Sequence, residues 1–128
     1  MHWPLRAACL GLLALACQNE APLDVAQVDL SRMQKPWFEI TKLPRPSQAG
    51  CTGTTAPFRL KSPNELLRRH WIIEVGSDYE YAVVGHPTRD YLWLMSRERT
   101  LPQVTLQGML TRAKQRGFPT GILDYTQQ

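Results

Sequence analysis

The sequence is short of the residues and motifs that most enzymes and metal sites need. It has three histidines in 128 residues, and neither His70 nor His86 has a cysteine, histidine or carboxylate at metal-site spacing. A Gly-x-Ser-x-Gly nucleophile turn and a phosphate-binding loop are also absent from the sequence. We therefore expect no metal, no cofactor and no enzyme activity, and we favour a binding protein.

Cysteine is scarce as well, with Cys9, Cys17 and Cys51 as the complete set. The first two lie in an N-terminal segment that we expect to be processed, so no internal disulfide is available. A reactive thiol at Cys51 would make the protein a small thiol enzyme. No base lies nearby in the sequence, so we interpret Cys51 as a small hydrophobic packing residue.

The N-terminal apolar run is too short to cross a membrane as a helix. It covers residues 7–16, AACLGLLALA, whereas a bilayer needs about 20 apolar residues. With Arg6 in front and small residues at its end, the run is typical of a secretory signal peptide over residues 1–16.

Cys17 follows Ala14-Leu15-Ala16, and this arrangement resembles the lipobox of bacterial lipoproteins, although Ala14 stands where that family usually has leucine. The resemblance implies a diacylglyceryl thioether on Cys17, cleavage before it, and an acyl chain such as palmitate on the new amino terminus. Several acyl chains make a stable anchor. Gln18 resembles the lipoproteins that Gram-negative bacteria move to the outer membrane, which implies a lipid-anchored protein on its periplasmic side. The alternative is an ordinary cleaved signal peptide with a plain thiol at Cys17.

Charge is not in large excess either. The net charge of +4 falls to +3 when Arg6 leaves with the signal, which suits an anionic membrane surface. Nucleic-acid binding would need clustered lysines and arginines on one face, so we expect no nucleic-acid partner. The remaining 112 residues divide into a lipidated tether without periodicity at 17–27 and one domain at 28–128.

Aromatic and β-branched residues are concentrated between Trp71 and Arg97. Three short runs of Val, Ile, Tyr and Trp are separated by turn residues at 76–78 and 85–88, which predicts three successive antiparallel strands. Further strands are expected at 36–43 and at 52–60, the second interrupted by glycine and proline. Residues 28–32 predict a short helical turn or an irregular lead-in.

One helix follows the strands. Thr100 is placed to cap it, Pro102 lies in the first turn, and Gln103 occupies the position that a capping box requires. Leu106, Met109, Leu110 and Ala113 form one apolar stripe that packs from outside, and Gly117 marks the end. Residues 122–125 predict a short final strand.

These segments together resemble the bacterial lipocalins, and most of all the outer-membrane lipoprotein lipocalins related to apolipoprotein D. The resemblance covers about residues 28–60 and 70–128. It rests on residues 37–40 with Leu43-Pro44, on Gly50-Cys51-Thr52, on Asp78-Tyr79 with residues 81–85, on residues 89–97, and on the helix that ends at Gly117-Phe118.

The resemblance implies an antiparallel up-and-down barrel with an internal ligand site. By the same resemblance Trp37 plugs the closed end of the barrel and Arg97 lies across its indole. Asp90 and Tyr91 match the second lipocalin motif, which also belongs at the closed end. Lys35 stands where the first family motif has glycine, so the chain must enter the barrel differently.

The middle of the chain is too short for a complete lipocalin barrel. Only nine residues, 61–69, separate Leu60 from His70, where the third, fourth and fifth strands are expected. The fold class is therefore mainly β: a truncated or incomplete lipocalin-like barrel of about five strands, with one C-terminal helix and a short final strand. Either the two open edges pair in a smaller barrel, or two chains complete each other as a homodimer, or the reading frame is decayed or misassigned.

Strand alternation proposes Trp71, Ile73, Tyr81 and Trp93 as residues lining a ligand cavity, the alternative being plain core. By resemblance the protein is a membrane-anchored binder of small apolar ligands, fatty acids or lysophospholipids, in lipid storage or transport for membrane maintenance. The alternative is a structural or interaction lipoprotein whose pocket has been lost by truncation.

Overall fold

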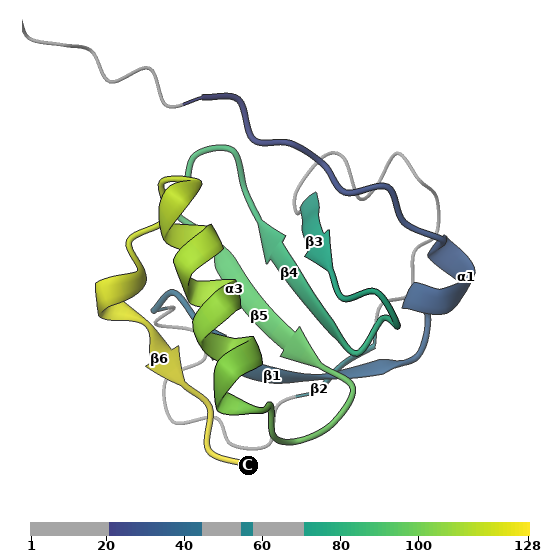
Figure 1. Cartoon of the computed structure of the whole chain (residues 1–128). Coiled ribbons are helices and arrows are strands. Elements are labelled where there is room, and N and C mark those ends of the chain that lie inside the picture. The colour runs from purple at the N-terminus through teal and green to yellow at the C-terminus, as the bar shows by residue number, and fades with distance from the viewer. Residues whose placement is uncertain (1–20, 45–54, 58–70) are drawn as a thin grey trace, which may run out of the picture.

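The computed structural model describes residues 21–44, 55–57 and 71–128 (Figure 1). Antiparallel strands make up most of the regular secondary structure, and one long helix and a short terminal strand follow them. In chain order the elements are α1 (Leu30–Met33), β1 (Pro36–Lys42), β2 (Thr55–Pro57), β3 (Trp71–Val75), β4 (Tyr81–Gly85), β5 (Leu92–Ser96), α3 (Gln103–Gln115), the 3-10 turn η2 (Thr120–Ile122) and β6 (Asp124–Tyr125).

The strands form one antiparallel sheet in the order β2-β1-β5-β4-β3, and β6 pairs with β1 beside it. The predicted mainly β fold and the three-stranded meander are confirmed. Within the described ranges the sheet is not closed, because β2 and β3 form its two ends. The expected strand at 52–60 is described only at 55–57, and its other residues lie outside the described part of the chain.

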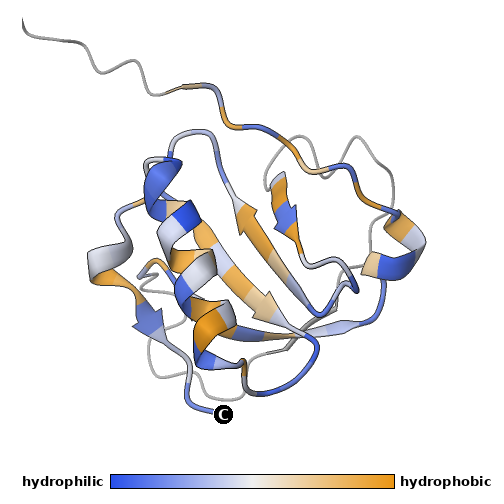
Figure 2. Ribbon diagram, viewed as in Figure 1, coloured by the Kyte–Doolittle hydropathy of each residue, from blue (hydrophilic) through white to orange (hydrophobic). Residues whose placement is uncertain are grey.

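Helix α3 covers one face of the sheet, beneath which apolar residues are concentrated on β4 and β5 (Figure 2). We call the cluster between them the helix-side core. Met109 and Ala113 of the predicted stripe are fully buried in it. Its buried members are Leu23, Leu43, Ile73, Val83, Leu92, Leu94, Met109, Ala113 and Phe118.

The ends of α3 match the sequence prediction in part. The helix begins at Gln103, with Pro102 at the N-cap position and no side-chain capping bond, so the predicted capping box is wrong. Pro102 has an extended ψ of 137° and lies outside the helix, which leaves Thr100 two residues too early to cap it. Gly117 ends the helix as predicted, with a φ of 91° in the left-handed region that glycine tolerates.

The other face of the sheet carries a second cluster, which we call the inner core. It contains the fully buried Trp37 from the start of β1 and residues from three further strands. Its buried members are Met33, Trp37, Ile72, Ala82, Val84 and Met95. The sheet is therefore apolar on both faces, as a barrel wall beneath an outer helix must be.

The segment expected to be a lipidated tether, 17–27, packs against the domain in its described part. Leu23 is 6% exposed and belongs to the helix-side core. The N–H of Ala26 donates to the carbonyl of Ile72 at 2.9 Å, so the segment runs beside the outer edge of β3 (Figure 1). An unpaired strand edge invites association with another chain, and this segment covers part of it.

Candidate functional site

Trp37 and Arg97 meet at one end of the sheet. The indole of Trp37 is fully buried, and its Nε1 donates to the carbonyl of Met33 at 3.0 Å. The guanidinium carbon of Arg97, which follows β5, lies 3.5 Å from the centre of the Trp37 ring. This is a cation–π contact in which the charged group also closes the apolar interior.

The same guanidinium ties three segments together. It donates to the carbonyls of Tyr79 at 3.3 Å and Lys35 at 2.7 Å, and also to those of Pro36 and Arg32. Burial lowers the pKa of Arg97 from its ordinary value. The backbone of Lys35, where the family motif has glycine, is thus held in place by the arginine.

The expected position of Asp90 and Tyr91 at this closed end is wrong. Tyr81 pairs with Ser96 near Arg97, whereas Gly85 pairs with Leu92 at the opposite end of the two strands. The turn that contains Asp90 and Tyr91 joins that opposite end, which we call the open end. Tyr91 is 37% exposed there and stacks on Trp93, with ring centres 6.1 Å apart.

Tyr79 occupies the closed end instead. Its hydroxyl accepts a hydrogen bond from the N–H of Asp29 at 2.8 Å, and Arg32 lies 3.9 Å from its ring centre. Asp78 precedes it in the turn between β3 and β4. The position of Tyr79 could have been predicted from the sequence. In an antiparallel meander successive turns alternate between the two ends of the sheet, so the turn before β4 lies at the same end as Arg97, which follows β5.

The four proposed lining residues do not share a face. Trp71, Ile73 and Tyr81 pack against the helix-side core, and only Trp93 packs against the inner core. The strand register explains this. Trp71 lies opposite Gly85, which lies opposite Leu92, and Tyr81 lies opposite Ser96. Leu92 and Ser96 are one and three residues from Trp93 on β5, so their side chains point to the other face of the sheet. The four residues therefore cannot line one cavity together.

A bulge in β3 changes its alternation. Ile72 pairs with Val84 and Glu74 with Val83, so Ile73 is the extra residue. Ile73 and Glu74 consequently both lie on the helix side, while Val75 moves to the inner core. A strict period of two, which places Val75 with Ile73, fails at this point.

Glu74 connects the sheet to α3. Its carboxylate accepts from Arg112 at 2.7 and 2.9 Å and from Arg116 at 2.8 Å. Burial raises the pKa of Glu74, but the hydrogen bonds from Arg112 and Arg116 and the charge of Arg112 outweigh burial and leave the pKa below its ordinary value. Burial, and then the charge of Glu74, raise the pKa of the neighbouring Tyr81.

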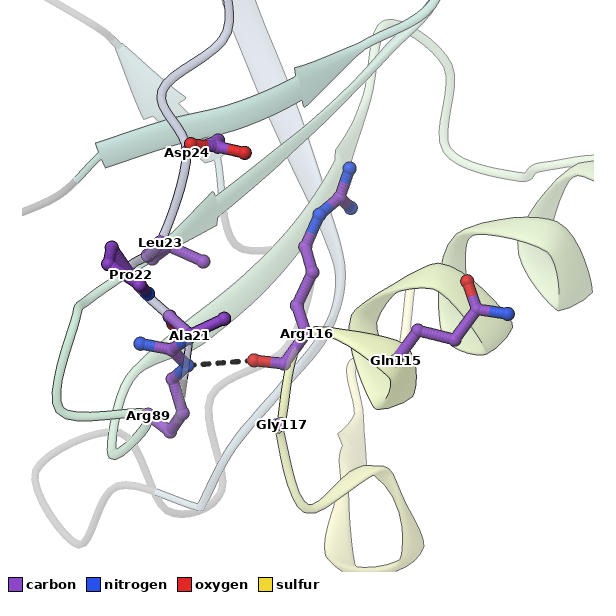
Figure 3. A pocket seen from close by; sticks show the side chains of 8 residues that line it. All are labelled: Ala21, Pro22, Leu23, Asp24, Arg89, Gln115, Arg116 and Gly117. Atoms are coloured by element: carbon purple, nitrogen blue, oxygen red, sulfur yellow. Dashed lines mark hydrogen bonds between the residues drawn. The ribbon is translucent and has the colours of Figure 1, made fainter. Parts of the chain in front are cut away.

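Arg89 organises the open end (Figure 3). It is 8% exposed, has a φ of 65°, and donates to the carbonyls of Ala21 at 2.6 Å and Arg116 at 2.8 Å. It thereby joins the N-terminal segment, the turn before β5 and the end of α3. A pocket of about 260 Å³ lies here, lined by Ala21, Pro22, Leu23, Asp24, Arg89, Gln115, Arg116 and Gly117.

A second pocket, of about 640 Å³, lies at the closed end. Arg32, Lys35 and Arg97 give it a basic lining, and Phe38 and Tyr79 add two rings. Both pockets are at the rims of the sheet rather than on the inner core. Among the described residues no group of three histidine, cysteine or acidic side chains is placed to hold a metal ion, and no helix there has the length and apolarity to cross a membrane.

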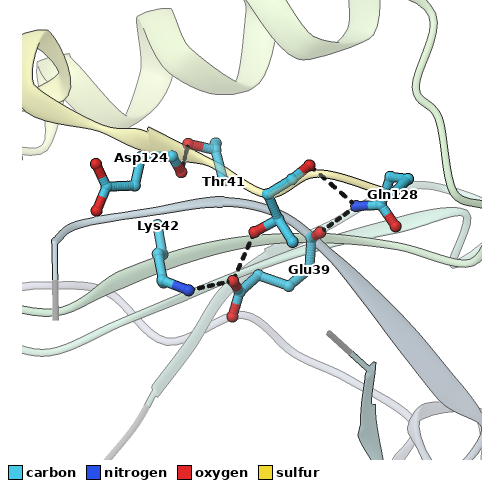
Figure 4. Close-up of polar contacts among 6 residues, drawn as sticks. Glu39, Thr41, Lys42, Asp124 and Gln128 are labelled. Atoms are coloured by element: carbon cyan, nitrogen blue, oxygen red, sulfur yellow. Dashed lines mark hydrogen bonds and ion pairs between the residues drawn. The ribbon is translucent and has the colours of Figure 1, made fainter. Parts of the chain in front are cut away.

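Glu39 and Lys42 form a buried ion pair on β1, with Nζ 2.6 Å from Oε1 (Figure 4). The C-terminal residues hold the glutamate as well, through the Thr126 hydroxyl to Oε1 at 2.6 Å and the Gln128 amide to the backbone carbonyl at 2.7 Å. Sequence reasoning missed this pair. Residues three apart on a regular strand face opposite sides, so the pattern gave no signal for it.

The chain is similar to known lipocalins in sequence and in fold. A family model described as a lipocalin-like domain matches residues 59–128. Temperature-induced lipocalin-1 of Arabidopsis thaliana is 30% identical over 59 residues, 46% of this chain and 32% of that protein. Outer membrane lipoprotein Blc of Vibrio cholerae is 43% identical over 51 residues, 40% of this chain and 30% of that protein. The matched part of this chain therefore spans about a third of the length of these two curated relatives.

The fold of the chain is similar to that of a solved structure. Insecticyanin from the tobacco hornworm Manduca sexta superposes with a TM-score of 0.61 over 88% of this chain and 86% of that one. The sequence identity is 16%, so the likeness concerns the fold.

Proposed function

Because the chain belongs to the lipocalin family, we propose that it binds small apolar ligands, fatty acids or lysophospholipids, and stores or carries them for membrane maintenance. The observation that carries the proposal is the inner core, an apolar face that Trp37 and Arg97 close at one end. At the open end Tyr91 and Trp93 form an aromatic path from the surface to that face. Aromatic rings offer large apolar contact area to an acyl chain.

The proposal describes a binding protein rather than an enzyme. Three groups with a shifted pKa, Glu74, Tyr81 and Arg112, are engaged with one another between the sheet and α3. The ion pair of Glu74 and Arg112 holds the helix to the sheet on the side away from the inner core. Cys51, the candidate thiol, lies outside the described residues.

We further propose that Cys17 carries the lipid anchor and that the protein resides on the periplasmic side of the outer membrane. Relatives named outer membrane lipoprotein Blc support this location. Cys17 also lies outside the described residues, and Ala21, four positions later, is bonded to Arg89 at the open end. Four residue steps span at most about 15 Å, so an acylated Cys17 would hold the open end close to the membrane surface.

The anchor is tested by Cys17→Ser. The wild-type chain is expected in the outer-membrane fraction and the variant in the periplasm, because the variant lacks the acceptor thiol. Cys9→Ser is the matched control and keeps the membrane location. A Cys17→Ser protein that stays in the membrane fraction would overturn the anchor.

Ligand binding is tested with the full chain carrying Cys17→Ser, by titrating medium-chain fatty acids and lysophospholipids and recording tryptophan emission. Saturable binding supports the carrier function. A folded chain that binds neither class contradicts it and favours the structural or interaction lipoprotein.

A further inference from the structure

On the inner face of the sheet, the residues that the structure describes include a buried pair of charges. The residues Glu39 and Lys42 are 2% and 4% exposed, and their charged atoms lie 2.6 Å apart. Burying two charges costs several kcal/mol per ion before their attraction is counted, and an apolar pair of the same size is often as stable. Such a pair inside an apolar wall calls for a role beyond stability.

The pair lies on the ligand side of the sheet. Glu39 pairs with Met95 and Lys42 with Trp93, and directly opposed residues on neighbouring strands point to the same face. Met95 and Trp93 both belong to or pack on the inner core. Figure 4 shows the two side chains on the side of β1 that faces away from α3.

A β-bulge brings the two side chains together. In β1 the register shifts between Glu39 and Thr41, which makes Ile40 the extra residue. Without it Lys42 would point to the helix side, because residues at i and i+3 of a regular strand lie on opposite faces. Bulges commonly re-aim a side chain in this way.

The hydrogen bonds of the pair are unequal. Glu39 Oε1 accepts from both Lys42 and Thr126. Lys42 Nζ has three N–H donors and makes one bond to the described residues, the bond to Glu39. Within the described part of the chain, two of its donors therefore remain for another acceptor, and a buried donor left without a partner costs about 1–3 kcal/mol.

We infer that Lys42 binds the uncharged carbonyl oxygen at the head of an acyl-chain ligand, such as the carbonyl of an acyl ester. This inference rests on the proposed function and sharpens its ligand class. Glu39 already neutralises the ammonium, so a carboxylate would bring an unbalanced negative charge into the apolar interior. A neutral carbonyl accepts the two remaining N–H groups without that cost. The acyl chain then runs from Lys42, near the open end, toward Trp37.

The test compares methyl laurate with laurate at pH 8, where laurate is fully ionised. Binding to the full chain carrying Cys17→Ser is measured by displacement of a polarity-sensitive apolar dye. Methyl laurate is expected to bind at least about tenfold more tightly than laurate. Lys42→Met lowers the affinity for the ester by about tenfold, and Lys114→Met, at an exposed position on α3, is the matched control that leaves it unchanged.

Glu39→Gln gives the sharpest outcome. It leaves Lys42 without a counter-charge, so the preference reverses and laurate binds more tightly than the ester. Thermal unfolding confirms that each variant is folded. The ratio of the affinities for methyl laurate and laurate is also measured with Glu39 and Lys42 unchanged, where no variant of the site is needed. Equal or tighter binding of laurate by that site overturns this inference while the proposed function stands. Failure of both ligands to bind contradicts the proposed function itself.

Discussion

The guanidinium of Arg97 covers the indole of Trp37 at 3.5 Å and donates to the carbonyls of Lys35, Pro36, Arg32 and Tyr79. One side chain thus joins the end of β5, the start of β1, α1 and the turn between β3 and β4. These segments are up to 65 positions apart in the sequence. This single charged group therefore links four parts of the closed end.

Replacing Arg97 by methionine is expected to lower the free energy of unfolding by about 2–4 kcal/mol. The cation–π contact contributes about 0.5–2 kcal/mol, and four backbone carbonyls, one of them part-buried, lose a charged hydrogen-bond donor. Chemical denaturation followed by tryptophan emission measures the change. Arg99→Met is the matched control, because Arg99 is exposed and lies 4.9 Å from the Phe38 ring. A change below 1 kcal/mol for Arg97→Met would contradict this account of the closed end.

The ion pairs of Glu74 make the stability depend on pH. Its pKa is lowered in the folded chain, so its contribution is complete above the ordinary value of 4.5 and disappears as the pH falls through the lowered folded value. Glu74→Gln should therefore destabilise the protein at pH 7 by about 1–2 kcal/mol and much less at pH 3. Denaturation curves at both values measure this.

The exposed Glu98 provides the comparison for that experiment, since Glu98→Gln is expected to leave stability nearly unchanged at both pH values. Equal effects of Glu74→Gln at pH 7 and pH 3 would show that the arginines do not hold the carboxylate in solution.

The sequence determines the local features of this fold and leaves the long-range ones open. Alternating apolar runs and turn residues predict β3, β4 and β5, and an apolar stripe with Gly117 predicts α3. The bulges at Ile73 and Ile40 depend on hydrogen bonds with neighbouring strands, so no pattern within one strand reveals them. They decide which residues of these two strands face the inner core.

The candidate site illustrates the same limit. Trp37 and Arg97 could be paired by family resemblance, but Asp90-Tyr91 and Asp78-Tyr79 are two Asp-Tyr pairs that local sequence does not distinguish. The two pairs lie at opposite ends of the sheet, and only the directions of β4 and β5 show which pair lies at which end.

Leu23 tests whether the N-terminal segment is docked in solution. Leu23→Ala is expected to lower the free energy of unfolding by about 2–3 kcal/mol, because Leu23 is 6% exposed in the helix-side core. Val25→Ala, at a side chain that is 41% exposed, should cost less than about 1 kcal/mol. Urea denaturation of both variants measures the difference. Equal small effects would mean that the segment is a free tether.

Trp93 and Trp71 can be used to test which face of the sheet binds the ligand. Trp93 packs on the inner core, and Trp71 packs on the helix-side core. Bromine atoms on an acyl chain quench tryptophan emission at short range, so a ligand on the inner face quenches Trp93 more than Trp71.

Trp93→Phe should therefore remove more of the ligand-induced quenching than Trp71→Phe does, because phenylalanine preserves most of the apolar contact at either position. Titrations of the two variants with the same brominated acyl ligand measure the quenched fraction, and unchanged affinity shows that the site itself is intact. Loss of the quenching in Trp71→Phe alone would place the ligand between the sheet and α3 and reverse the assignment of the two faces.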